Sequence, residues 1–154
     1  MDWTVKPRPR LFWGFRRMHE PAQTVLLVDD DAPLLAATRR FLAVRGLEVI
    51  ASDSPIGVQQ LIREHEPHVL VLDLEMPALN GDALARLIQA RAATKDLPIV
   101  FYSGAEDGVT TGLEDRFRGA TFVHKSEGPA ALYAAIRAKL RGGGPPSSRR
   151  APAR

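Results

Sequence analysis

Carboxylate side chains follow two apolar segments of this 154-residue chain, at the point where each segment ends. Asp29, Asp30 and Asp31 come after the first segment, and Asp73 comes after the second, with Glu75 two residues further on. Asp31 precedes Ala-Pro, so we interpret it as the cap of a helix. The other carboxylates offer the hard oxygen ligands that Mg²⁺ prefers, with water and a phosphate group completing its octahedron. The pattern therefore predicts a site for magnesium and a phosphoryl group.

Two further polar residues follow later apolar segments, and both suit the same chemistry. Lys125 supplies a positive charge for phosphoryl oxygens, and the Ser103 hydroxyl supplies a hydrogen bond. Asp73 is then the natural nucleophile, because carboxylates accept phosphoryl groups as acyl phosphates. The chain contains no cysteine, and no Ser–His pairing competes for this role. Taken alone, Lys125 would be read as an ordinary surface lysine, so its interpretation depends on the acidic cluster.

The segments that carry these residues alternate between two periodicities. Short β-branched and apolar runs predict strands, and apolar residues three and four positions apart predict helices. The predicted strands are 24–28, 47–51, 69–72, 97–102 and 121–124. The predicted helices run from 32 to Gly46, over 55–64, from Asn80-Gly81 through Ile88, over 106–118 and over 129–140. The fourth helix should be weak, because it contains two glycines and two threonines.

This alternation predicts an α/β domain with a parallel sheet covered by helices on both faces. In such a sheet the ligand site lies beyond the carboxyl ends of the strands. The polar residues named above follow four of the five predicted strands. We therefore expect them to converge at one edge of the sheet.

Composition and charge exclude several classes of function. The formal charge is +3, but basic residues concentrate in 1–20 and 141–154 and leave the middle of the chain acidic. A domain that binds nucleic acid directly needs a basic face, so we do not expect that function. No apolar run approaches the roughly 18 residues of a membrane span. Because no signal peptide is recognisable either, the expected location is the cytoplasm.

Two terminal segments lie outside the alternating pattern. We interpret residues 1–22 as an N-terminal extension that is either flexible or the product of a start placed upstream of Met18. Its aromatic and basic residues also suit a membrane surface or a partner protein. Residues 141–154 consist almost entirely of Gly, Pro, Ser, Ala and Arg, which predicts a disordered basic tail. The domain itself should span residues 23–140.

Four short motifs resemble the receiver domains of two-component response regulators. They are Val25-Leu-Leu-Val-Asp-Asp30, Val69-Leu-Val-Leu-Asp-Leu-Glu-Met-Pro77 with Asn80-Gly81, Tyr102-Ser-Gly104 and Phe122-Val-His-Lys125. Each is weak alone, but the four occur in the right order at the expected strand ends. The resemblance implies a flavodoxin-like, doubly wound sheet with strand order 2-1-3-4-5 and five helices. Because no output domain follows residue 140, the chain resembles the single-domain, chemotaxis-type members.

The resemblance implies a role for each residue of the acidic site. Asp73 is the phosphoacceptor in a phosphorelay, and the donor is a sensor histidine kinase or a histidine phosphotransfer protein. Asp29, Asp30, Asp73 and the backbone carbonyl of Glu75 hold Mg²⁺. Lys125 binds the phosphoryl group. The protein is then no enzyme beyond its own phosphotransfer and autodephosphorylation.

The resemblance also implies a switch. Ser103 is the hydroxyl that moves toward the phosphoryl group, and Phe122 is the aromatic residue that rotates behind it. The surface that responds is formed by the fourth helix, the fifth strand and the fifth helix, and it binds a downstream protein target that the sequence does not name. On residue type alone, Phe122 is explained equally well as a core residue.

The sequence departs from the family pattern after Lys125, where proline in a cis peptide is usual and Ser126 stands instead. One alternative function is therefore a phosphorylation-independent adaptor. A second is a Mg²⁺-dependent phosphatase of the haloacid-dehalogenase type, because Asp73-Leu-Glu75 faintly resembles the Asp-x-Asp motif of that family. A flavodoxin-like electron carrier is disfavoured, because three aspartates would repel a flavin phosphate.

Overall fold

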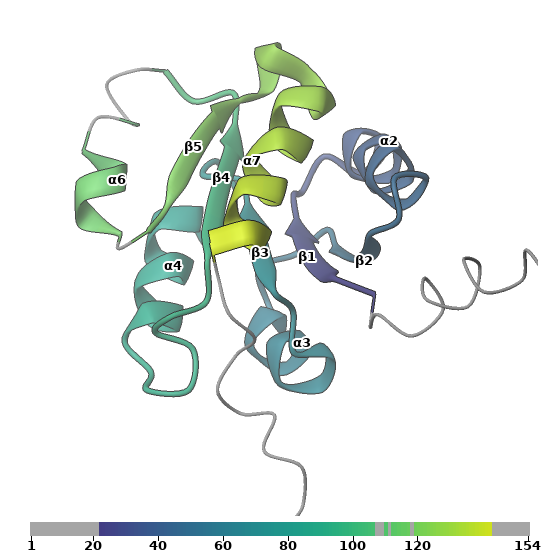
Figure 1. The fold of residues 1–154 in the computed structure, drawn as a ribbon. Helices are drawn as coiled ribbons and strands as arrows, with labels where there is room; N and C mark the ends of the chain where they lie inside the picture. The colour runs from purple at the N-terminus through teal and green to yellow at the C-terminus, as the bar shows by residue number, and fades with distance from the viewer. Residues whose placement is uncertain (1–21, 107–109, 111, 118, 143–154) are drawn as a thin grey trace, which may run out of the picture.

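A central parallel sheet organises the chain. The computed structural model describes residues 22–106, 110, 112–117 and 119–142. Within them, five strands form one sheet in the order β2-β1-β3-β4-β5, and all the pairs are parallel. The sheet is covered by helices on both sides (Figure 1). This confirms the predicted flavodoxin-like α/β architecture and its strand order.

The strands follow the apolar runs closely. They are β1 (Thr24–Val28), β2 (Glu48–Ser52), β3 (Val69–Leu72), β4 (Ile99–Ser103) and β5 (Thr121–His124). Every residue of β1, β3 and β4 is buried, as expected for strands packed on both faces. The predicted bounds hold for β1, β3 and β5. Strand β2 begins and ends one residue later than predicted, and β4 begins two residues later and ends one residue later.

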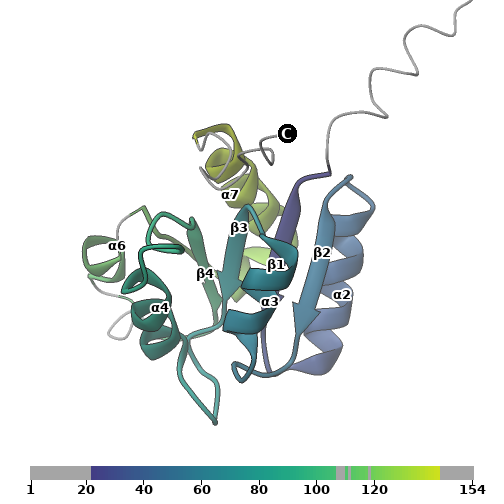
Figure 2. The same ribbon diagram turned by 90° about the horizontal axis from the view of Figure 1, so that it is seen from below.

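Two apolar cores lie on opposite faces of the sheet (Figures 1 and 2). On one face, helices α2 (Ala32–Ala43) and α7 (Gly128–Gly142) pack against the sheet. On the other, α3 (Val58–His65), α4 (Gly81–Gln89) and the short α6 (Leu113–Arg116) do so. Side chains alternate between the faces along each strand, so Leu26 joins one core and Leu27 joins the other.

The fourth predicted helix, over 106–118, is interrupted. Its described part includes the four-residue helix α6, preceded by Gly112 with φ 76°. A left-handed glycine interrupts right-handed helical geometry, which explains why α6 begins only after it. Residues 107–109, 111 and 118 of the predicted range lie outside the described residues. The other four helices have between eight and fifteen residues.

The predicted terminal segments lie almost entirely outside the described residues, which begin at 22 and end at 142. Helix α7 continues to Gly142, two residues into the segment predicted as a tail. A search of the described residues finds no helix with the length and apolar character needed to cross a membrane.

Candidate functional site

Three carboxylates meet beyond the ends of β1 and β3. In the register of these two strands, Val28 pairs with Leu72, so the next residues, Asp29 and Asp73, follow side by side. Both residues are buried, at 3% and 4% exposure, whereas Asp30 is exposed. Carboxylate oxygens of these three residues lie within 4.8 Å of one another. The strand ends therefore bring together the acidic residues predicted from their positions in the sequence.

Backbone groups hold one oxygen of each buried carboxylate. The Asp31 N–H donates to Asp29 Oδ1 at 2.9 Å, and the Glu75 N–H donates to Asp73 Oδ1 at 3.2 Å. Asp31 also caps α2, because its Oδ1 accepts the Leu34 N–H at 3.1 Å, as predicted. These bonds fix both carboxylates and leave their Oδ2 atoms for other partners.

Lys125, which directly follows β5, is the partner of the Oδ2 atoms of Asp29 and Asp73. Its Nζ donates to Asp29 Oδ2 at 2.7 Å and to Asp73 Oδ2 at 2.9 Å. Because β4 lies between β3 and β5, the lysine side chain reaches past the end of β4 to make these contacts. Lys125 is thus part of the site and not an ordinary surface lysine.

Burial and hydrogen bonding have opposite effects on the pKa values of Asp29 and Lys125. Burial raises the pKa of Asp29, and the negative charge of Asp73 adds to this, while hydrogen bonds from Lys125 and the Asp31 N–H oppose it. Burial alone would lower the pKa of Lys125, but its hydrogen bonds to Asp29 and Asp73 outweigh burial and raise it. Lys125 therefore remains charged and compensates the two buried carboxylates.

The donor set suits a hard divalent cation. Three carboxylates and one ammonium group leave two formal negative charges uncompensated within a cluster of oxygen atoms. Asp30 is exposed, so the cluster has a side open to solvent from which an ion can enter. Mg²⁺ is bound in proteins by one or two carboxylates together with water and phosphate oxygens. The residues present fit that ion.

The remaining predicted site residues surround this cluster. Ser103 ends β4, between the strands of Asp73 and Lys125, and its fully buried hydroxyl accepts the Ala105 N–H at 3.3 Å. Phe122 is half-buried against the core on the α3 and α4 face, so the core interpretation describes its present position. Glu75 is exposed, and its backbone N–H is bound to Asp73.

The segment after Lys125 forms a short helical turn, which the sequence did not indicate. Residues Lys125–Glu127 make a 3₁₀ turn, η2, and the Lys125–Ser126 peptide is trans, as are all peptides in the described residues. His124 caps this turn, and Glu127 completes a capping box by accepting the His124 backbone N–H at 2.9 Å. The usual capping-box pattern begins with Ser or Thr, so a histidine cap gave no recognisable signal.

Gly81 is a second residue whose importance the sequence did not reveal. A Cβ atom built on this first residue of α4 would lie 2.1 Å from the backbone oxygen of Asp73. The Gly81 N–H also donates to the Leu74 carbonyl at 3.1 Å. The glycine therefore lets α4 start directly against the backbone of the buried aspartate, whereas its sequence position beside Asn80 indicated only the start of a helix.

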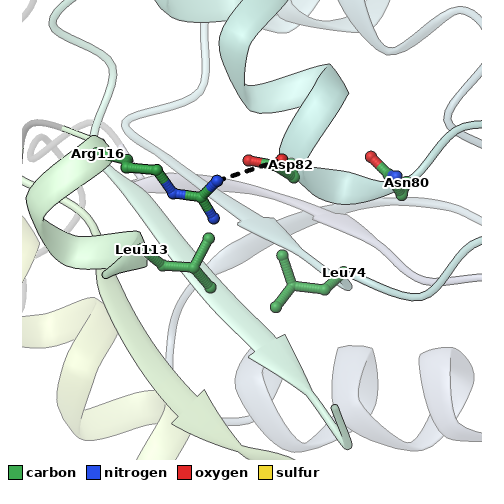
Figure 3. A pocket seen from close by; sticks show the side chains of 5 residues that line it. All are labelled: Leu74, Asn80, Asp82, Leu113 and Arg116. Carbon is green, nitrogen blue, oxygen red and sulfur yellow. Dashed lines mark ion pairs between the residues drawn. The ribbon is translucent and has the colours of Figure 1, made fainter. Parts of the chain in front are cut away.

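A small pocket lies between α4 and α6 (Figure 3). It has a volume of about 120 Å³ and is lined by Leu74, Asn80, Asp82, Leu113 and Arg116. Arg116 and Asp82 approach to 3.8 Å across it, and Arg86 binds the same carboxylate oxygen at 3.0 Å. The residues that line it do not include Asp29, Asp30, Asp73 or Lys125, so this pocket is not part of the acidic site.

This fold and site define a class of signalling domain. The family model of the response regulator receiver domain matches residues 25–137. The chain belongs to this family, as its four motifs suggested. Proteins of the family act in two-component signal transduction.

Relatives of known identity agree with this assignment. The chain is 30% identical over 128 residues to the phosphate regulon transcriptional regulatory protein PhoB of Pseudomonas aeruginosa, covering 82% of this chain and 55% of PhoB. It is 35% identical over 97 residues to the transcriptional regulatory protein KdpE of Mycobacterium tuberculosis, covering 56% of this chain and 43% of KdpE. The chain thus spans about half the length of these relatives.

Solved structures show the same fold. A LuxR-family two-component response regulator from Aurantimonas superposes with a TM-score of 0.70 at 27% identity, covering 79% of this chain and 87% of that one. The Vibrio cholerae chemotaxis protein CheY4 superposes with a TM-score of 0.71 at 18% identity, covering 78% and 100%. At this lower identity the likeness concerns the fold alone.

Proposed function

We propose that Asp73 accepts a phosphoryl group from a phosphohistidine, carried by a histidine kinase or a histidine phosphotransfer protein. The observation that carries this proposal is the convergence of Asp29, Asp73 and Lys125 through the 2.7 and 2.9 Å contacts of the lysine ammonium. Membership of the receiver family supports it. The protein is then a phosphoacceptor and catalyses only its own phosphorylation and dephosphorylation.

The transfer exchanges one bond for another. Asp73 Oδ2 attacks phosphorus, the O–P bond forms as the N–P bond of the phosphohistidine breaks, and the electron pair returns to the imidazole, which takes up a proton. Asp73 Oδ1 is held by the Glu75 N–H, so its other oxygen faces the reaction. Lys125 then exchanges its contact with Asp73 for one with a phosphoryl oxygen, while Asp29 keeps the other.

Asp29, Asp30, Asp73 and the Glu75 carbonyl are the proposed ligands of Mg²⁺. The bound ion would reduce the repulsion between these carboxylates and the incoming phosphoryl oxygens. Ser103 would donate its hydroxyl to the phosphoryl group after giving up its bond with the Ala105 N–H. That movement would allow Phe122 to rotate and alter the surface formed by α6, β5 and α7, where the downstream protein binds.

Intact mass spectrometry after incubation with acetyl phosphate tests this function. We expect a single phosphoryl adduct that requires Mg²⁺ and is absent from Asp73→Asn. Asp53→Asn is the matched control, because Asp53 is an exposed acid following β2 at the same edge of the sheet.

Absence of the adduct from the wild type, also with a histidine kinase as donor, would favour the phosphorylation-independent adaptor. Rapid turnover of a chromogenic phosphate ester would instead favour the phosphatase alternative, although the family to which the chain belongs speaks against it.

A further inference from the structure

The position of Lys125 depends on a backbone turn that side chains hold together. Within the described residues, Lys125 is the one cation paired with Asp29 or Asp73, and it is also the first residue of η2. The direction in which its side chain leaves the backbone is therefore set by the geometry of that turn. Whatever fixes η2 also fixes the ammonium group relative to the two carboxylates.

His124 and Glu127 make the contacts that define the turn. His124 Nδ1 accepts the Ser126 backbone N–H at 3.1 Å and lies 2.6 Å from the Ser126 hydroxyl. Glu127 Oε2 accepts the His124 backbone N–H at 2.9 Å, which closes the box from the other side. The Gly128 N–H then bonds to the Lys125 carbonyl. Each end of the turn is thus bound by a side chain or by the backbone.

The histidine ring also contacts the strand that leads into the site. Its centroid lies 6.4 Å from that of Phe122, in an edge-on arrangement. Residues two apart in a strand share one face, so Phe122 and His124 lie together, while Lys125, in the turn that follows, reaches Asp29 and Asp73. The ring of His124 is therefore held between Phe122 and Ser126.

We propose that His124 and Glu127 are positioning residues, whose capping box holds Lys125 where it binds the two carboxylates and, after phosphotransfer, the phosphoryl group. The second part of this statement rests on the proposed function, whereas the first concerns the protein before any phosphotransfer. Neither residue contacts the reacting atoms in this proposal, and each acts through the backbone of Lys125.

Conservative substitutions separate capping from other effects. Asn is a common capping residue whose side-chain oxygen can accept the N–H that His124 Nδ1 accepts, and Gln replaces Glu in capping boxes. His124→Asn and Glu127→Gln should therefore keep the turn, whereas His124→Ala and Glu127→Ala should release it. Thr94→Val is the control for stability. Thr94 lies in the loop after α4, away from the carboxyl ends of the strands, and the substitution removes its hydrogen bond to the Ile88 carbonyl.

The first measurement is the ammonium signal of Lys125 in ¹⁵N-labelled, metal-free protein, assigned by its absence from Lys125→Met. We expect the signal in the wild type, His124→Asn, Glu127→Gln and Thr94→Val, and its loss or a large shift in both alanine variants. The second measurement is the rate of phosphoryl loading from acetyl phosphate with Mg²⁺. We expect it to fall about fivefold in the alanine variants, the factor that corresponds to one lost cap.

Unchanged ammonium signals and loading rates in both alanine variants would overturn the proposal. A loss that the Asn and Gln variants share equally with the alanine variants would do the same, since capping could not then be its cause. If the ammonium signal responds as expected but the wild type takes up no phosphoryl group, the cap positions Lys125 and the proposed function is what fails.

Discussion

At the scale of single residues, the sequence predicts some contacts of the site and not others. Asp29, Asp73 and Lys125 could be placed together because each follows a strand of a parallel sheet. The role of Gly81 could not be predicted in this way. A Cβ atom at this position would lie 2.1 Å from the Asp73 carbonyl oxygen, and only folding brings the two residues together. Charge and strand position are visible in a sequence, whereas a close backbone approach is not.

Replacing Gly81 with alanine should disturb Asp73 directly. The added methyl group would collide with the Asp73 carbonyl, so α4 or the β3 end must shift. We expect Gly81→Ala to lower the free energy of unfolding by about 1–3 kcal/mol, the range for overpacked sites, and to slow phosphoryl loading. Urea denaturation and intact mass measure the two effects. Gly104→Ala is the matched control, because its added Cβ meets nothing within 4 Å, and an equal effect there would contradict the explanation.

Removing the charge of Lys125 should destabilise the metal-free protein. Lys125→Met leaves Asp29 and Asp73 buried without their cation, and a hydrogen bond to a charged group contributes roughly 1.5–3 kcal/mol. We expect a loss of that order in urea denaturation with EDTA, and a smaller loss when Mg²⁺ supplies the missing positive charge. Lys95→Met removes an exposed lysine for comparison. Equal stability of the two variants in EDTA would show that the buried carboxylates do not depend on Lys125.

At the scale of elements, prediction succeeded where apolar pattern alone decides structure. Runs such as Val69–Leu72 are buried on both faces and have one stable conformation, so their bounds followed from the sequence. The range 106–118 contains two glycines and two threonines, and the predicted helix is interrupted at the left-handed Gly112, after which α6 has four residues. The η2 turn escaped prediction because its cap is a histidine, which resembles no common capping residue.

Because α6 is short, its backbone amides should be weakly protected from hydrogen exchange. A helix of four residues is too short to be stable by itself, so it depends on Leu113 and Phe117 in the core and on the Arg116–Asp82 contact. We expect the amides of 113–116 to exchange with deuterium at least tenfold faster than those of α4. Arg116→Ala should accelerate exchange further in α6 but leave α2 unchanged. Protection of α6 equal to that of α4 would show that its length does not limit its stability.

At the scale of the whole molecule, the site joins parts of the chain that are far apart in sequence. Asp29 follows β1, Asp73 follows β3 and Lys125 follows β5, so their contacts exist only when the four strands from β1 to β5 in the sheet order β1-β3-β4-β5 are paired. A ligand that binds this cluster therefore binds the folded state and not the unfolded chain. Ion binding and global stability must then be linked, by RT ln(1 + [L]/Kd) for one site.

This linkage predicts that Mg²⁺ raises the melting temperature, by an amount that grows with the logarithm of its concentration once this exceeds Kd. At a concentration 100 times Kd, the stabilisation amounts to about 2.7 kcal/mol. Asp30→Asn should abolish most of this gain while costing little stability without the ion, because Asp30 is exposed. Asp53→Asn should keep the gain, since Asp53 lies outside the three-carboxylate cluster. Differential scanning calorimetry at constant ionic strength separates specific binding from charge screening, and an equal Mg²⁺ effect in both variants would place the ion elsewhere on the protein.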